Sequence, residues 1–142
     1  MTIEAILQSK GGDVTSIART ATVADAVKLL AARRIGAVPV FDGDSVVGIF
    51  SERDVIHALD THGAAALDGS IGDVMTAPAI TVSRGETALG ALSLMTRRRI
   101  RHLPVVEQGR IVGFISIGDL VKYRIDRIEA DAEAMRSYIQ SA

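Results

Sequence analysis

The chain has 142 residues, 48% of them hydrophobic and 23% charged, with a formal net charge of −1. This composition excludes wholesale disorder, and the near-neutral charge gives no general attraction to nucleic acid or to anionic membranes. Because the sequence has no cysteine, disulfide bonds and thiolate metal sites are excluded. No apolar run approaches the roughly 18 residues that a spanning helix needs, and the first residues lack a signal-peptide pattern. We therefore expect a cytoplasmic protein with neither a membrane nor a nucleic acid as partner.

The sequence carries an internal duplication, because residues 14–60 align without a gap on residues 79–125 at an offset of 65. Within each copy the hydrophobic pattern changes in the same order, from short alternation to a helical stripe and then to two β-rich runs joined by a tight turn. A second helix follows from Ser51 or Ser116. The alternating stretches are 14–18 and 79–83, the helical stripes run from Val23 to Leu30 and from Ala88 to Met95, and the β-rich runs are 37–41, 46–50, 102–106 and 110–115.

Each copy is predicted to form strand, helix, strand, strand, helix, and one copy alone would bury too little apolar surface to be stable. We therefore expect an α/β (α+β) fold in which two β-α-β-β-α repeats pack about a pseudo-twofold axis and leave two related clefts between them. The first repeat is expected at residues 1–62, a linker at 63–70, the second repeat at 71–127 and an extension of the C-terminal helix at 128–142.

Both copies contain the pattern Gly-h-h-Ser-x-x-Asp, where h is apolar, at the point where the last strand ends and the last helix begins. The first copy of this motif is residues 48–54 and the second is residues 113–119. A serine at a helix N-cap followed three residues later by an acid is typical of a capping box, which satisfies backbone donors. The same groups place a hydroxyl, a carboxylate and the partly positive helix end where they could bind a ribose diol. The two interpretations are compatible.

Together, the duplicated order of elements, the segments 33–40 (RRIGAVPV) and 98–105 (RRIRHLPV) and the two motifs resemble a tandem pair of cystathionine β-synthase (CBS) domains, the Bateman module, over about residues 1–127. The resemblance implies that adenosine-containing ligands such as AMP, ADP, ATP, NAD or S-adenosylmethionine bind in the two clefts. It implies AMP as the foremost ligand, with NAD or ATP as alternatives, and no covalently bound cofactor.

The resemblance also assigns residues to the ligand. The motif aspartates, Asp54 and Asp119, would bind the ribose hydroxyls, and Ser51 and Ser116 would lie near the ribose or the phosphate. For the apolar residues expected at the adenine, packing in the core is the alternative interpretation. Adenine would contact the first strand and the segment before the proline of each copy, at Ser16, Ile17, Gly36, Ala37 and Val38 and at Thr81, Val82, Arg101, His102 and Leu103.

Basic residues gather at the ends of the two equivalent helices, where cations stabilise the negative helix end. Arg101 and His102 lie past the second of these helices, and we assign them to the phosphate of a ligand in the second cleft. Arg53 lies inside the first motif, whereas Gly118 takes that place in the second, so we expect the two clefts to differ chemically. The segment Lys10-Gly11-Gly12 lacks a Walker motif and is interpreted as a surface loop.

The C-terminal segment has a heptad pattern, because its apolar residues are spaced 4, 3, 4, 3 and 4 apart. We favour packing of this stripe on a second identical chain, and packing back on its own domain is the alternative. The stripe consists of Val121, Ile125, Ile128, Ala132, Met135 and Ile139.

The sequence offers three histidines without metal-ligand spacing, and neither an H-E-x-x-H nor a G-x-S-x-G motif. We therefore predict a non-catalytic regulatory module, without a metal, whose adenosine ligand alters its affinity for a partner protein. The alternative is a constitutive dimerisation or scaffold module without a physiological ligand, in which the C-terminal helix is the working surface.

Overall fold

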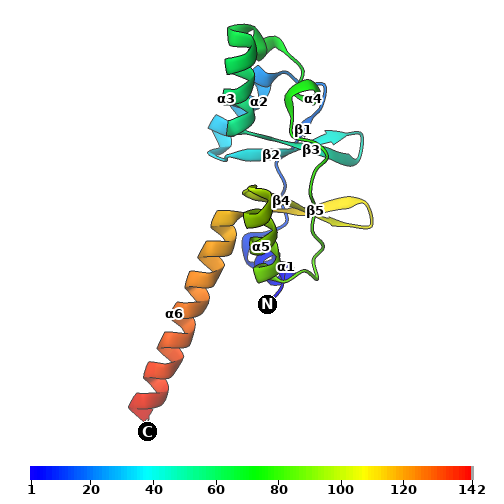
Figure 1. Ribbon diagram of the computed structural model, residues 1–142. Coiled ribbons are helices and arrows are strands. Elements are labelled where there is room, and N and C mark those ends of the chain that lie inside the picture. The colour runs from blue at the N-terminus through cyan, green and yellow to red at the C-terminus, as the bar shows by residue number, and fades with distance from the viewer. Residues whose placement is uncertain (142) are drawn as a thin grey trace.

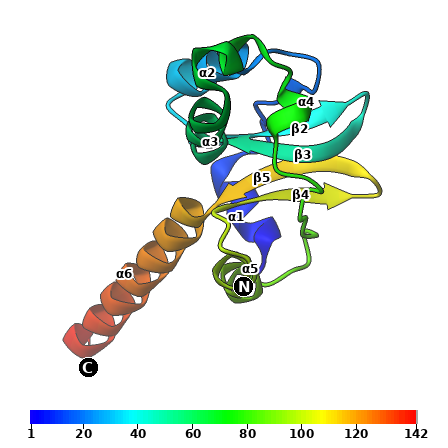
Figure 2. The ribbon, with the colours of Figure 1, turned by 45° about the horizontal axis from the view of Figure 1, so that its top comes forward.

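The computed structural model describes residues 1–141 and shows two α/β units, with one long helix projecting away from them (Figure 1). The elements are α1 (Ile3–Lys10), β1 (Ile17–Ala18), α2 (Val23–Arg33), β2 (Ala37–Asp42), β3 (Ser45–Ser51), α3 (Glu52–His62), the 3-10 helix η1 (Gly63–Asp68), α4 (Ile71–Val74), α5 (Ala88–Arg98), β4 (His102–Glu107), β5 (Arg110–Ser116) and α6 (Ile117–Ser141). The sheets are β1-β2-β3 and β4-β5, and β3 contacts β5 where the two units meet (Figure 2).

The helices α2 and α5 occupy equivalent places in the two repeats, and they begin and end in the same way. Thr22 caps α2 and Thr87 caps α5, each accepting a hydrogen bond from a backbone N–H of the first turn. Both helices end in the left-handed conformation, at Arg34 with φ 53° and at Arg99 with φ 55°. The duplicated sequence therefore gives α2 and α5 the same start and the same end, so that β2 and β4 follow them with the same backbone geometry.

The two sheets differ in their first strand. β1 pairs in parallel with β2 over Ile17–Ala18 only, and the corresponding stretch 79–83 forms a single bridge, between Val82 and Val105. The strands predicted at 14–18 and 79–83 are therefore too long. Alternation of apolar and polar residues predicts an extended chain. It does not show where the chain stops pairing, and here a turn follows within two residues of each paired position.

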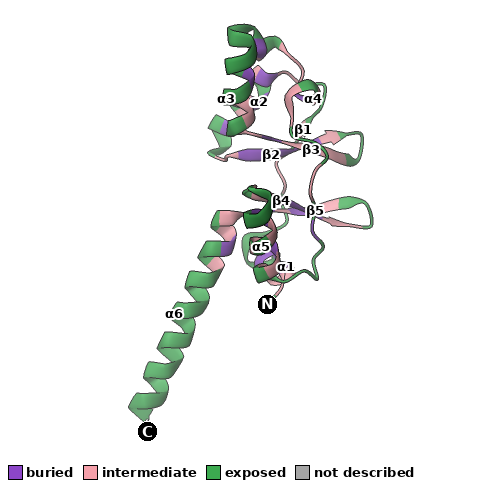
Figure 3. Ribbon diagram, in the orientation of Figure 1, coloured by how far each residue is buried: buried purple, intermediate pink, exposed green. Residues whose placement is uncertain are grey.

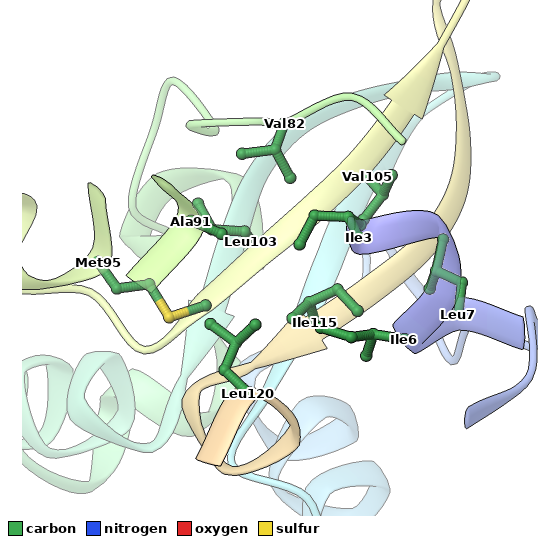
Figure 4. Packing of buried hydrophobic residues seen from close by; sticks show 10 residues of the cluster. All are labelled: Ile3, Ile6, Leu7, Val82, Ala91, Met95, Leu103, Val105, Ile115 and Leu120. Atoms are coloured by element: carbon green, nitrogen blue, oxygen red, sulfur yellow. The ribbon is translucent and has the colours of Figure 1, made fainter. Parts of the chain in front are cut away.

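Each unit has its own apolar core, and the helix that precedes each repeat packs in the core of the other repeat. α1 contributes Ile3 and Leu7 to the core of β4 and β5 (Figure 4), whereas α4 contributes Ile71 to the core of β2 and β3. Backbone bonds fix this exchange, because the Ile3 N–H donates to the Glu86 carbonyl and the Ile71 N–H to the Ala21 carbonyl, both at 2.9 Å. The exchanged helices tie the two units together.

The long helix α6 leaves the second unit after its first turns (Figure 3). Leu120 is buried in the core of that unit and Tyr123 packs against it. The stripe beyond them is exposed, with Ile128 54% and Met135 60% accessible, so it does not pack back on its own domain. No helix among residues 1–141 is both long enough and apolar enough to cross a membrane.

Candidate functional site

An open pocket with a volume of about 520 Å³ lies between the two units. One wall is the end of β3 and the start of α3, which carry the first Gly-h-h-Ser-x-x-Asp motif. The opposite wall is the segment that joins α5 to β4, and residues 78–80 and Thr76 complete the lining. The pocket therefore combines the motif of one repeat with the segment before the proline of the other.

Asp54 and Ser51 form the capping box of α3 in this wall. The Ser51 backbone N–H and hydroxyl donate to Asp54 Oδ2 at 2.8 and 3.1 Å, and the Asp54 N–H donates to Ser51 Oγ at 3.4 Å. Thr76 Oγ1 donates to the other carboxylate oxygen at 2.9 Å. The predicted capping box is confirmed. Neutral donors hold the Asp54 carboxylate in place, and it is half-buried, so it can still accept a hydrogen bond from a ligand.

The pocket lining combines carboxylate, cationic and apolar side chains. Its arginines outnumber its carboxylates, which are those of Glu52 and Asp54. The arginines are Arg53, Arg98, Arg99 and Arg101, and the apolar side chains include Ile49, Ile80 and Ile100. A ligand with a flat apolar ring, a diol and an anionic group would match these three kinds of surface.

His102 lies in the pocket lining and stacks on Phe114, with ring centroids 5.5 Å apart and planes 14° apart. Burial lowers the pKa of His102 and the charge of Lys10 lowers it further, while the carboxylates of Asp119 and Glu52 oppose the shift. The lowered pKa therefore favours the neutral imidazole at pH 7. The neutral ring can hydrogen-bond to a phosphate at that pH, but it adds no positive charge.

The second motif has the same cap but a charged third partner. The Ser116 N–H donates to Asp119 Oδ2 at 2.8 Å, and the Asp119 N–H donates to Ser116 Oγ at 3.1 Å. The Lys10 ammonium, at the end of α1, lies 2.6 Å from Asp119 Oδ2 and 2.5 Å from the Phe114 carbonyl oxygen. Burial alone would raise the pKa of Asp119, but the hydrogen bonds from Lys10 and Ser116 and the Lys10 charge outweigh burial and lower it.

The structure brings part of the predicted site together and leaves the rest outside the pocket lining. Arg101 and His102 share the pocket with Asp54, whereas the sequence grouped them with the second motif. Inside the lining are Gly36, Ser51, Arg53, Asp54, Arg101 and His102. Outside it, Ala37, Val38, Val82 and Leu103 are buried, Ile17 is half-buried, Ser16 and Thr81 are exposed, and Ser116 and Asp119 cap α6.

Sequence reasoning missed Lys10 and Thr76, although each contacts the aspartate of a motif. Lys10 is not in a surface loop but is the last residue of α1. The separation along the chain from lysine to aspartate is 109 residues, and no local pattern links residues so far apart. The similarity of residues 3–7 to residues 71–75 was the available signal, because it makes α1 and α4 equivalent helices, so that the chain after each is expected near a motif.

The chain is similar to known proteins in sequence and in fold. A model of the CBS domain matches residues 5–61 and 71–126. The chain is 32% identical to the CBS domain-containing protein CBSX3, mitochondrial, of Arabidopsis thaliana, over 98% of this chain and 72% of that protein. The CBS-domain containing protein ATU1752 from Agrobacterium tumefaciens matches at a TM-score of 0.84 and 39% identity, over 87% of this chain and 99% of that chain.

A further solved structure, CBSX2 in complex with AMP, matches at a TM-score of 0.70 and 24% identity, over 80% of this chain and 89% of that chain. At this identity the match supports the fold. Two matched segments of nearly equal length, in the order that the duplication predicts, cover most of the chain. The chain therefore belongs to the CBS-domain family and carries two CBS domains in tandem.

Proposed function

We propose that the pocket at Asp54 binds an adenosine-containing ligand, foremost AMP, and that the chain is a non-catalytic regulatory module. One observation carries this proposal. The Asp54 carboxylate stands at the N-terminus of α3 and faces, within one pocket, the arginines that follow α5 in the other unit. The volume of about 520 Å³ lies in the range of roughly 300 to 1,000 Å³ that is typical of small-molecule sites.

Each part of AMP has a counterpart in the lining. The ribose hydroxyls would donate to the Asp54 carboxylate, and adenine would lie against Ile49 and Ile80. The phosphate would bind Arg101 and the neighbouring arginines through charge-assisted hydrogen bonds. AMP is the ligand in the CBSX2 structure, and this supports the same ligand class. ADP, ATP and NAD share the adenosine part and differ in the phosphate groups that would bind the arginines of the lining.

A ligand in this pocket would act on both units at once. Because the lining comes from both repeats, a bound nucleotide favours the relative arrangement of the units that contacts it best. A partner protein that prefers this arrangement would bind more tightly, with a coupling free energy of about 1 to 3 kcal/mol. The Asp54 carboxylate is already held by the α3 cap, which suits a binding role better than that of a mobile catalytic base.

Isothermal titration of the full chain with AMP tests the proposal. Asp54→Ala removes charge-assisted hydrogen bonds worth about 1.5 to 3 kcal/mol, so the dissociation constant for the pocket should rise at least about tenfold. Asp25→Ala is the matched control, because Asp25 forms an equivalent capping box with Thr22 at the start of α2, away from the pocket lining. Asp25→Ala should lose stability through the cap and keep its AMP affinity. Equal affinities of both variants for AMP would contradict the proposal.

A second candidate function is dimerisation through α6, favoured by the exposed stripe from Val121 to Ile139. Its charges suit a second copy of the same chain. In two parallel helices in register, Arg124 and Asp131 lie at positions that face Glu129 and Arg136 of the partner subunit, so both flanking pairs join opposite charges. The exposed fractions of Ile125 (49%) and Ile139 (65%) are surface that such a pairing would cover.

Sedimentation and cross-linking test this second candidate. Ile128→Asp should convert the dimer to a monomer and leave the thermal unfolding of the units unchanged, because Ile128 lies outside both cores. The chain has no native cysteine, so Ala132→Cys should form a disulfide-linked dimer only if the two helices run parallel and in register. A wild-type monomer at all concentrations would exclude dimerisation as the function of α6.

A further inference from the structure

The aspartate of the second motif already has a cationic partner supplied by the opposite end of the chain. Lys10 Nζ lies 2.6 Å from Asp119 Oδ2 and 2.5 Å from the Phe114 carbonyl oxygen. The side chains of Lys10 and Asp119 are 36% and 24% exposed, so both charges are partly withdrawn from water. An ammonium in this position is stable because a carboxylate and a carbonyl accept its hydrogen bonds.

The first motif offers a contrast, because its aspartate is contacted on the other carboxylate oxygen and by a neutral group. There the third contact of the aspartate is the neutral hydroxyl of Thr76, 2.9 Å from Asp54 Oδ1. A hydroxyl can rotate away from a carboxylate at little cost, since it carries no charge. A lysine that yields its carboxylate to the hydroxyls of a ligand keeps a positive charge that needs another anion.

We propose that Lys10 makes the site at Asp119 selective for nucleotides that carry a phosphate, against the corresponding neutral nucleosides. This inference rests on the proposed function, that is, on binding of ribose by the motif aspartates. A ribose diol that binds both carboxylate oxygens of Asp119 competes with the Lys10 ammonium for Oδ2, and a phosphate on the same ligand supplies a new partner for the ammonium. A neutral nucleoside competes for the same oxygen and supplies no new partner.

The chain around Lys10 allows this movement. The lysine side chain has a flexible stem of four carbons, and Lys10 is the last residue of α1. The next residue, Gly11, has a φ of 98°, and no other atom lies within 4 Å of a Cβ placed there. The sequence has three extra residues in this region relative to the second repeat. The ammonium can therefore swing without disturbing the apolar residues of α1 that pack in the core.

Isothermal titration of Asp54→Ala, in which the first site is weakened, isolates the second site, and AMP and adenosine are the probes. In this background AMP should bind more tightly than adenosine. Adding Lys10→Met frees Asp119 and removes the cation, so the ratio of the adenosine and AMP dissociation constants should fall about tenfold. Lys10→Arg keeps a cation and should retain the selectivity. Lys28→Met, which removes an exposed lysine of α2, is the matched control and should not change the ratio.

The outcomes separate this inference from the proposed function. If wild type binds AMP and the selectivity of Asp54→Ala is unchanged when Lys10→Met is added, the inference is overturned and the proposed function stands. The same holds if wild type binds AMP but Asp54→Ala binds neither probe. If wild type binds neither AMP nor adenosine, both fall together. Circular dichroism of each variant verifies the fold before titration.

Discussion

The two motif aspartates share a backbone arrangement and differ in the further groups that contact their carboxylates. Both accept a hydrogen bond from the backbone N–H of the motif serine at 2.8 Å and both cap a helix. Asp54 is completed by the hydroxyl of Thr76 and lines an open pocket, whereas Asp119 is completed by the ammonium of Lys10. The duplication therefore preserves the serine–aspartate cap of each motif, and the additional partner, Thr76 or Lys10, sets the charge around each aspartate.

The origin of this difference lies in the exchanged helices. α4 ends at Val74, and the chain then pairs with β3, where the backbones of Thr76 and Ile49 exchange two hydrogen bonds of 2.9 Å. α1 is longer and ends at Lys10. The same exchange thus brings a short polar side chain to one motif and a long cationic one to the other.

The largest expected effect comes from the glycine that begins each motif. A Cβ at Gly48 would stand 2.7 Å from both Met75 Sδ and the Thr76 carbonyl oxygen, and the latter is backbone that cannot move away cheaply. Gly48→Ala should lower the free energy of unfolding by about 1 to 3 kcal/mol through overpacking. It should also weaken AMP binding, because it displaces Thr76 from Asp54. Chemical denaturation and titration with AMP measure the two effects.

Gly113→Ala is the matched change in the second unit. The three atoms nearest to a Cβ there all belong to the side chain of Leu7, which can adopt another rotamer. We expect a smaller loss of stability and unchanged AMP binding at the Asp54 pocket. If Gly113→Ala were the more harmful of the two for AMP binding, the comparison between the two motifs would fail.

A smaller effect is expected from Asp119→Asn, which tests the ion pair with Lys10. The folded pKa of Asp119 is lowered below its ordinary value of 3.8, chiefly by Lys10 and Ser116 acting against burial. Its contribution is therefore complete above about pH 4 and is lost as the pH falls through the lower folded pKa. Asp119→Asn should cost about 1 kcal/mol at pH 7 through the weakened cap and ion pair. Its unfolding free energy should change less than that of wild type between pH 5 and pH 2.5, and parallel curves would contradict the ion pair.

The smallest effect is expected from His102→Gln. Burial lowers the folded pKa of His102 from 6.5, so the unfolded chain binds more protons just below pH 6.5. Wild type should therefore lose stability as the pH falls from about 6.5 through the folded pKa. His102→Gln should lose less over this interval, as followed by thermal unfolding at closely spaced pH values. An equal loss in both proteins would mean that His102 titrates as in the unfolded chain.

The sequence predicted most elements of the fold because each depends on local pattern. The motif capping boxes, the helical stripes and the β-hairpins are set within a few neighbouring residues, and the duplication gave each assignment twice. The exchange of α1 and α4 could not be predicted, since an apolar stripe shows that a helix packs but not in which core. For the same reason the predicted linker gave no sign that Ala66 of η1 would be buried.

The sequence predicted which residues belong to the candidate site better than it predicted which of them share one pocket. Ser51 and Asp54 could be recognised because a motif carries them, whereas the pocket joins them to Arg101 of the other repeat. Sequence order places Arg101 near Asp119, and only the stacking of the two units brings it to Asp54. The cytoplasmic location and the partner protein depend on properties outside the fold and stay predictions.

A crystal structure of the full chain grown with AMP tests the central claim most directly. We predict AMP in the pocket between the units, with its ribose hydroxyls within hydrogen-bonding distance of the Asp54 carboxylate and its phosphate at the arginines that follow α5. A pocket without nucleotide at saturating AMP, or a nucleotide bound elsewhere with Asp54 held only by Ser51 and Thr76, would contradict the account.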